Sequence, residues 1–390
     1  MSISIATLLG VEQVRHQVKH NFTHAVSGVD LIIGARTGNL HLLLYSVFNI
    51  GTPTNNMRWQ TYQAIVNDPQ VAWAIPISLG DSHRGYRVVG TSQSYFESFS
   101  YGNQQALTFA QGKSFNDLFD VVLGSEVAKT LAYELNDSIV LAHGMATTSF
   151  SMHQQHPFNI TGILAPTGTP VDRAVYVSLQ AIEAIHMDWR QGVRPSNTTD
   201  SQHLKDLKAL EPKQITTVMV GLRSKLTTFR TQRALNEYRQ EPLTAILPGV
   251  ALSELWQMVS VLENTLLFVS ALVYLAACLG VSAMLLSSIR ERHNEMQLLR
   301  AIGVPPILLF WLIECEALMI ILLSSIIGAS LIALLIWLLG DVLLLQFGVY
   351  ITIDLFSRST LIGLVALLVT SLCLAAIPSF TAYRQACTLR

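Results

Sequence analysis

The sequence predicts an α-helical integral membrane domain and a mixed α+β outer domain. The chain has 390 residues, of which 51% are hydrophobic and only 13% are charged, whereas a soluble domain carries about 25% charged residues. Three uncharged apolar runs occupy residues 265–289, 317–340 and 359–383. Each is long enough to cross a bilayer, which takes about 20 residues as a helix. The residues before about 263 are mixed, polar and rich in turn residues.

The N-terminus is apolar but short. Met1 to Val11 carries no charge and is too short to span a bilayer. It also lacks the basic start and the cleavage site of a signal peptide. We interpret it as the outer part of a membrane helix whose beginning is missing, followed by a helix over Glu12–Ala25 that leaves the membrane. An ordinary buried N-terminal helix is the alternative.

The polar part predicts alternating strands and helices. Short β-branched and aromatic runs bounded by turn residues indicate strands, and longer periodic stretches after a capping residue indicate helices. We expect a turn at Gly80–Asp81, with Asp81, His83 and Arg84 in a charged turn, and a loop over Ser196–Lys213. The expected strands are Val71–Leu79, Tyr86–Gly90, Val121–Gly124, Ser138–Ala142, Phe158–Leu164, Ala174–Val177, Thr216–Gly221 and Thr244–Leu247. The expected helices are Glu126–Glu134 and Thr227–Tyr238.

A long helix is predicted to begin at Ala251 and to run through Trp256 into the first apolar run. Both ends of the outer domain would then join membrane helices through continuous helical stalks. A motion on one side of the bilayer would reach the other side along such stalks, and a Gly-Pro insertion in a stalk should uncouple the two sides.

The most informative segment is the charged stretch Arg290–Gly303, which lies between two long apolar runs. Its apolar stripe, at the spacing of one helical face, is Met296, Leu299 and Ile302. Its polar surround is Arg290, Arg292, Glu295 and Arg300. Gly303 suits a helix end, and Pro305–Pro306 prevents continuation. The segment predicts a short helix at a membrane surface; a plain hairpin whose arginines only orient the protein is the alternative.

Arginines set the predicted orientation, because positive charge is enriched in cytoplasmic loops. The 290–303 segment and the C-terminal tail carry arginines, whereas the loop at 341–358 carries Asp341, Asp354 and one arginine. The 290–303 segment and the tail are therefore expected in the cytoplasm, and the 341–358 loop and the polar part outside. Glu314 and Glu316 lie near the start of the next membrane helix, where a structural or dimer-contact role is favoured over ion transport.

Motifs for catalysis and metal binding are weak. Gln111–Ser114 contains the GKS of a phosphate-binding loop, but Leu107 stands where that motif needs its first glycine. Neither an HExxH motif nor a GxSxG elbow is present, so no catalytic residue is expected. Two histidine groups, which we assign to polar surfaces rather than to a metal site, are His16, His20 and His24, and His153 and His156. No metal or cofactor is predicted, and a net charge of −1 gives no reason to expect nucleic acid binding.

Several motifs, in this order along the chain, resemble those of FtsX-like and MacB-type ABC permeases. Residues 295–303, EMQLLRAIG, are similar to the family signature E-x-x-x-L-R-A-x-G. Other similar positions in the apolar half are Glu316–Leu318 with Gly328, and Ile377–Pro378 with Ala382–Arg384. Those in the polar half, which resemble a MacB-like periplasmic core, are Val122–Gly124, Val127–Ala128, Gly162–Leu164 and Tyr176–Val177.

The resemblance implies a permease subunit of the MacB, LolC/LolE and FtsX class in the bacterial inner membrane. It implies four membrane helices, the first of which is truncated here, and a large domain in the periplasm. The implied partners are a separate cytoplasmic ABC ATPase, a second permease chain (a second copy or a paralogue), a periplasmic adaptor or substrate protein, and membrane lipids. The chain itself is expected to be non-catalytic, because ATP hydrolysis belongs to the partner.

The resemblance also assigns residues and boundaries. The implied ATPase-docking residues are Arg290, Arg292, Glu295, Met296, Leu299, Arg300 and Gly303. The implied structural residues of the membrane helices are Glu316, Gly328 and Pro378. The expected parts are the truncated first helix (1–12), stalks and periplasmic domain (13–255), second helix (256–289), coupling helix (290–303), third helix (304–340), periplasmic loop (341–358), fourth helix (359–384) and cytoplasmic tail (385–390).

The implied function is mechanotransmission, in which ATP-driven motion of the partner reaches the periplasmic domain. Its use would be export or extraction of a lipid, lipoprotein, peptide or small molecule. The alternative is an FtsX-like transducer that activates an envelope hydrolase without transport. An integral membrane enzyme is the third possibility, and it lacks a catalytic constellation.

Overall fold

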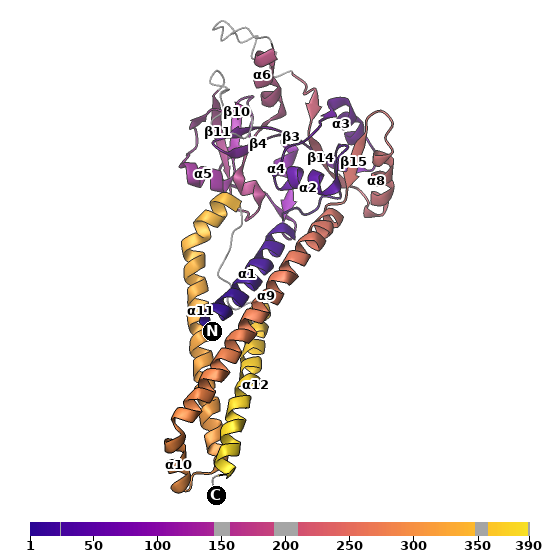
Figure 1. Ribbon diagram of the computed structural model, residues 1–390. Helices are drawn as coiled ribbons and strands as arrows, with labels where there is room; N and C mark the ends of the chain where they lie inside the picture. The colour runs from indigo at the N-terminus through magenta and orange to yellow at the C-terminus, as the bar shows by residue number, and fades with distance from the viewer. Residues whose placement is uncertain (24, 144–156, 191–209, 348–357, 389–390) are drawn as a thin grey trace. The chain divides into compact units, whose positions relative to one another are not determined.

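The computed structural model describes residues 1–23, 25–143, 157–190, 210–347 and 358–388. It contains two compact units. The first is His20–Gln257, and the second combines Met1–Lys19 with Met258–Arg390. We call them the α/β unit and the helical unit. Among the described residues, every strand lies in the α/β unit, and the helical unit holds only helices (Figure 1). This composition confirms the predicted fold class of a mixed α and β domain joined to long apolar helices.

Fifteen strands lie in the described part of the α/β unit. They are β1 (Leu31–Ala35), β2 (Met57–Arg58), β3 (Val71–His83), β4 (Tyr86–Thr91), β5 (Ser100–Tyr101), β6 (Gln105–Ala106), β7 (Phe109–Gly112), β8 (Asp120–Leu123), β9 (Ser138–Ile139), β10 (Ala142–His143), β11 (Phe158–Leu164), β12 (Ala174–Ser178), β13 (Gln214–Ile215), β14 (Thr217–Leu222) and β15 (Leu243–Ile246). The helices are α2 (Asn39–Val47), α3 (Trp59–Val66), α4 (Ser94–Ser98), α5 (Ser125–Leu131), η1 (Pro170–Arg173), α6 (Leu179–Arg190), η2 (Lys225–Thr227) and α8 (Thr228–Asn236).

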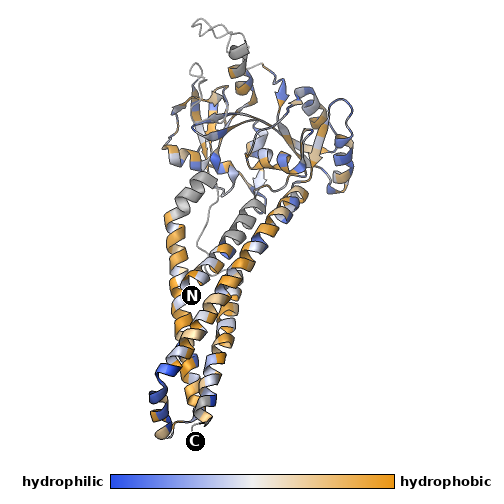
Figure 2. Ribbon diagram, in the orientation of Figure 1, coloured by the Kyte–Doolittle hydropathy of each residue, from blue (hydrophilic) through white to orange (hydrophobic). Residues whose placement is uncertain are grey.

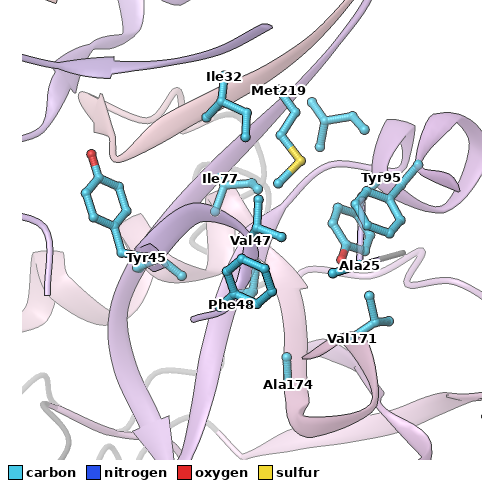
Figure 3. Close-up of a cluster of buried hydrophobic side chains, with 14 of the residues drawn as sticks. Ala25, Ile32, Tyr45, Val47, Phe48, Ile77, Tyr95, Val171, Ala174 and Met219 are labelled. Carbon is cyan, nitrogen blue, oxygen red and sulfur yellow. The ribbon is translucent and has the colours of Figure 1, made fainter. Parts of the chain in front are cut away.

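Eleven of these strands form one mixed sheet in the order β15-β1-β14-β3-β4-β12-β8-β11-β7, with β10 beside β3 and β9 beside β11. The β12–β4 and β11–β8 pairs are parallel. Strand residues alternate between two cores, because successive side chains point to opposite faces. Tyr176 lies in the core that contains residues of α2 and α4, whereas Val175 and Val177 lie in the core that contains residues of α5 and α6. Figure 3 shows part of the first core. Burial on both faces explains why this strand is apolar throughout.

The hairpin between β3 and β4 differs from the prediction. Strand β3 continues through Gly80 and Asp81 to His83, and the turn lies at Arg84–Gly85. Both turn residues have positive φ, 46° and 87°, as a type I′ hairpin turn requires. The expected turn at Gly80–Asp81 is therefore wrong. Asp81 and His83 are buried in the sheet rather than displayed in a charged turn.

Tertiary packing also alters other predicted elements. Helix α5 ends at Leu131 rather than Glu134, because Ala132 takes the left-handed conformation with φ 52°. The expected strand Ser138–Ala142 is divided between β9 and β10, which pair with different strands. Elements that the sequence did not predict include β1, β7, α2, α3, α4 and α6. The expected loop Ser196–Lys213 lies outside the described residues up to position 209.

Gly124 marks a close approach between backbone segments. It follows β8 and is the N-cap residue of α5. A Cβ at this position would overlap the carbonyl of Asp172 and lie 2.5 Å from the Val171 carbonyl oxygen. Asp172 is itself fixed, because its carboxylate accepts hydrogen bonds from the backbone N–H groups of Thr167 and Gly168. The glycine therefore lets η1 pack directly on the β8–α5 connection.

The helical unit contains α1 (Ser2–Thr23), α9 (Pro248–Glu291), α10 (His293–Ala301), α11 (Pro306–Phe347) and α12 (Arg358–Thr388), of which α1 and α9 begin or end in the α/β unit. Three helices in the described part of the chain are long and apolar enough to cross a membrane, within Pro248–Glu291, Pro306–Leu338 and Ile362–Arg384. Hydropathy is high along α11 and most of α9 and α12, whereas α10 is hydrophilic (Figure 2). Ile5, Ala6 and Leu9 of α1 pack in one cluster with Tyr274 and Ile332.

Helix bounds extend beyond two of the boundaries expected from sequence. Helix α9 begins at Pro248, three residues before the predicted helix start at Ala251, and α11 continues past 340 to Phe347. Residues 348–357 of the expected loop lie outside the described residues. Apolar content identifies where a helix is buried in lipid, but the helix ends where its backbone hydrogen bonds end.

Replacing Gly124 with alanine should destabilise the α/β unit by about 1–3 kcal/mol, because overpacking forces the backbone of η1 to move. Hydrogen exchange of the β8 and β12 amides in the full chain measures this change. Gly80→Ala is the matched control, since no atom lies within 4 Å of a Cβ built there. Equal exchange rates in the two variants would contradict the close-approach explanation.

The buried ring of His83 should make the α/β unit less stable in mild acid. Burial lowers the pKa of His83, the Val140 carbonyl bond partly opposes this, and the charge of Arg84 lowers the pKa further. An unfolded histidine binds a proton near pH 6.5, so the unfolded state gains protons first and stability falls as pH drops through about 6.5. The urea midpoint, followed by tryptophan fluorescence at about pH 7.5 and about pH 5.5, measures this loss. His83→Gln should reduce the difference; an unchanged difference would exclude His83 as its source.

Candidate functional site

The charged segment between α9 and α11 is a short helix closed at both ends. Arg292 is the N-cap residue of α10, and Ile302 is its C-cap residue. Gly303 follows with φ 101°. Its N–H donates to Arg300 O at 3.0 Å, and the Val304 N–H donates to Leu299 O at 3.1 Å. These two bonds form a Schellman motif, in which a glycine in the left-handed region ends the helix.

The next helix begins almost at once. Pro306 is the first residue of α11, a position where a missing N–H costs nothing. The Arg300 guanidinium donates to Val304 O at 3.0 Å, which adds a side-chain bond to the same turn. Glu295 in the first turn and Arg300 in the last turn complement the helix dipole. The direction of α10 relative to α11 is therefore fixed by the hydrogen bonds of this turn and by Pro306.

Met296 anchors α10 to the helical unit. Its side chain is half-buried and packs against a cluster of Ile289, Ile313 and Ala382, which come from α9, α11 and α12. Leu299 and Arg300 are also half-buried. The predicted stripe thus faces the bundle at Met296, whereas its other end, Ile302, is 73% exposed.

The exposed face of α10 combines charge with two apolar side chains. Glu295 of α10, its N-cap residue Arg292 and Arg290 at the end of α9 are exposed. Leu298 is 64% exposed and lies on this surface with Ile302. Sequence reasoning missed Leu298, because Met296, Leu298 and Leu299 are equally apolar and only packing against the bundle separates them. A surface of apolar and charged residues can dock a protein partner.

Gly328 allows two helices of the helical unit to approach. A Cβ at this position would lie 3.0 Å from Ser2 O and 3.3 Å from Ala6 N of α1. Small residues at such crossings let membrane helices pack backbone to backbone. The structural role that the resemblance implies for Gly328 stays a prediction; the structure shows this close approach to α1.

Pro378 lies inside α12 and lacks the N–H that would bond to the Leu374 carbonyl. The Ser282 hydroxyl of α9 donates to that carbonyl at 3.3 Å. Cys278 and Tyr274 lie one and two helical turns before Ser282 on the same side of α9, and both contact α12. The Cys278 Sγ lies 3.8 Å from the Ser371 hydroxyl oxygen, and the Tyr274 hydroxyl donates to Leu367 O at 2.7 Å. Polar side chains of α9 therefore partner backbone carbonyls of α12.

The two carboxylates of α11 differ in burial. Glu314 is buried, and its Oε1 has no hydrogen-bond partner within the described part of the chain. Glu316 is half-buried, so its side chain lies at the border of the packed helix core rather than inside it. Neither is close to enough ligands to form a metal site, since no group of three His, Cys, Asp or Glu is found among the described residues.

The GKS sequence and the histidine groups are the remaining weak motifs. Gly112 of the GKS sequence has φ 71° and lies against the Thr161 carbonyl of β11, where a side chain would not fit. It is a strand glycine with no phosphate-binding turn after it. His16 and His20 are on α1, although their side chains are not described, and His24, His153 and His156 lie outside the described residues.

Two family models together cover most of the chain. The MacB-like periplasmic core domain matches residues 1–238, and the FtsX-like permease C-terminal matches residues 267–386. This chain belongs to the MacB/FtsX-like ABC permease family. The predicted membership is therefore confirmed. ABC permeases of this kind are membrane components that work with an ATPase, and they are generally non-catalytic.

Two solved structures similar to this permease are the periplasmic region of one transporter and the extracellular domain of another. The periplasmic region of MacB from Actinobacillus actinomycetemcomitans has 11% sequence identity and a TM-score of 0.36, and the match covers 59% of this chain and 94% of that one. The extracellular domain of the noncanonic ABC-type transporter YknZ from Gram-positive bacteria has 11% identity and a TM-score of 0.32, covering 56% and 98%. No curated protein matches the chain.

A double-mutant cycle should reveal the bond between Ser282 and the Leu374 carbonyl. Ser282→Ala leaves that carbonyl unpartnered and should cost about 1 kcal/mol of helical-unit stability. In a Pro378→Ala background the restored N–H bonds to Leu374 instead, so the same change should cost much less. Unfolding of the full chain in mixed detergent measures both costs. Equal costs in the two backgrounds would show that Ser282 does not compensate for the proline.

Proposed function

We propose that this permease receives ATP-driven motion from a separate cytoplasmic ATPase at α10 and transmits it to the α/β unit in the periplasm. The ATPase would contact the exposed surface of α10 and its two ends, made of Arg290 at the end of α9, Arg292, Glu295, Leu298 and Ile302. A second permease chain, either another copy or a paralogue, would complete the complex in the inner membrane.

The geometry of α10 is the observation that carries this proposal. A docking helix has to present groups to its partner and also pass force to the membrane helices. The exposed charges with Leu298 and Ile302 suit the first task. The Schellman bonds at Gly303 and the packing of Met296 among three helices suit the second. A loosely connected loop would absorb the motion instead.

Helix α9 supports the transmission step. It runs without interruption from Pro248 to Glu291, beginning one residue after β15 and ending one residue before α10. Its Ala251 and Leu252 are buried in the α/β core, whereas Leu285 and Ile289 are buried in the helical unit. The output in the periplasm would be export or extraction of a lipid, lipoprotein, peptide or small molecule.

Co-purification of the ATPase with the full chain tests the docking surface. Leu298→Glu with Ile302→Glu should reduce retained ATPase at least tenfold, because a carboxylate placed at an apolar contact loses burial and remains unpaired. Ile50→Glu is the matched control, since Ile50 is an exposed aliphatic residue of the α/β unit and this change should not affect retention.

Met296 provides a second variant with a different expectation. Met296→Ala should keep most of the bound ATPase but lower ATPase stimulation in lipid, because it loosens α10 from the bundle without changing the exposed face. Retention of ATPase by the Leu298→Glu/Ile302→Glu chain, or its loss in the Ile50→Glu chain, would overturn docking at α10.

A further inference from the structure

We propose that the face of η2 and α8 in the α/β unit is a docking site for an acidic segment of a periplasmic protein. The proposal does not depend on ATPase docking at α10. It rests on an exposed apolar pair, Leu226 and Phe229, and on exposed basic side chains beside that pair. We call this surface the α8 face.

The apolar pair is unusually exposed. Leu226 is 94% exposed and Phe229 is 72% exposed, the two highest values for large hydrophobic side chains in the described α/β unit. The two residues are three positions apart, so their side chains share one side of the chain as η2 continues into α8. Aromatic and apolar side chains left in water in this way are typical of the centre of a protein interface.

Basic side chains surround the pair. The segment from Arg223 to Arg239 carries five basic residues and one acidic residue, although the whole chain has a net charge of −1. Arg233 pairs with Glu237 at 2.9 Å, and Arg223 is held by the Val71 carbonyl at 3.2 Å. Lys225 and Arg230 are exposed and form no ion pair with any described residue. Charge complementarity therefore calls for an acidic partner.

The opposite side of α8 explains why this face stays exposed. Thr231 donates to the Gln70 side chain at 2.9 Å, and Gln232 donates to the Ala245 carbonyl at 3.0 Å. The Ala245 N–H donates to Asn236 at 2.7 Å. These side chains satisfy the free edge of β15, so rotating α8 to bury Phe229 would leave edge groups unpartnered.

A protein is favoured over a lipid surface as the occupant. A helix that lies in a membrane interface needs a broad apolar face, whereas Phe229 is followed by Arg230, Thr231, Gln232 and Arg233. Two apolar anchors among arginines match the composition of protein interface centres. A second copy of the same positive surface would be repelled.

Site-specific photocrosslinking in cells that make the full chain tests the inference. Leu226→p-benzoylphenylalanine should give an adduct with one protein, and the crosslinked peptide should carry net negative charge. Gln105→p-benzoylphenylalanine, at an exposed site on β6, should not give that adduct. Adding Lys225→Glu and Arg230→Glu should reduce the adduct at least tenfold, and reversing the acidic residues of the crosslinked segment should restore it.

Controls separate this site from the ATPase site. Lys129→Glu, on the exposed side of α5, should leave the adduct unchanged, and the Lys225→Glu/Arg230→Glu chain should still co-purify with its ATPase. The proposal is overturned if no adduct forms, if the adduct is with phospholipid or with a second copy of the chain, if the crosslinked segment is not acidic, or if charge reversal leaves its yield unchanged.

Discussion

The need to give every backbone N–H and C=O group a partner shapes this protein at three places. Inside the bilayer no water can bond to a free carbonyl, and Ser282 of α9 bonds to the Leu374 carbonyl that Pro378 leaves open. At the end of α10, Gly303 and Val304 close the last turn. At the edge of the sheet, side chains of α8 bond to Ala245 of β15.

These hydrogen bonds determine which apolar side chains stay exposed. Closing α10 at Gly303 and inserting Met296 into the bundle turns Leu298 and Ile302 to the outside. Holding α8 by its polar inner side turns Leu226 and Phe229 to the outside in the same way. In both cases a short helix is fixed by hydrogen bonds or packing on one side, and apolar groups with charged neighbours stay exposed on the other.

The sheet provides the support for the α/β unit. Its central strands are apolar on both faces and are covered by α2 and α4 on one side and by α5 and α6 on the other. Gly124 lets η1 contact the β8–α5 connection without a side chain between them. Helix α9 begins one residue after the edge strand β15, so the edge of this support continues directly into the helix that enters the other unit.

The sequence by itself determined the family, the long apolar helices and the short charged helix between them, because hydrophobic runs, Gly303 and Pro305–Pro306 act through local chemistry. It also indicated most central strands. Tertiary structure alone decided that β3 continues to His83, because pairing with β4 and β10 outweighs the local turn preference of Gly80–Asp81. It alone separated Met296 from Leu298, since one is covered by three helices that are distant in sequence and the other is not.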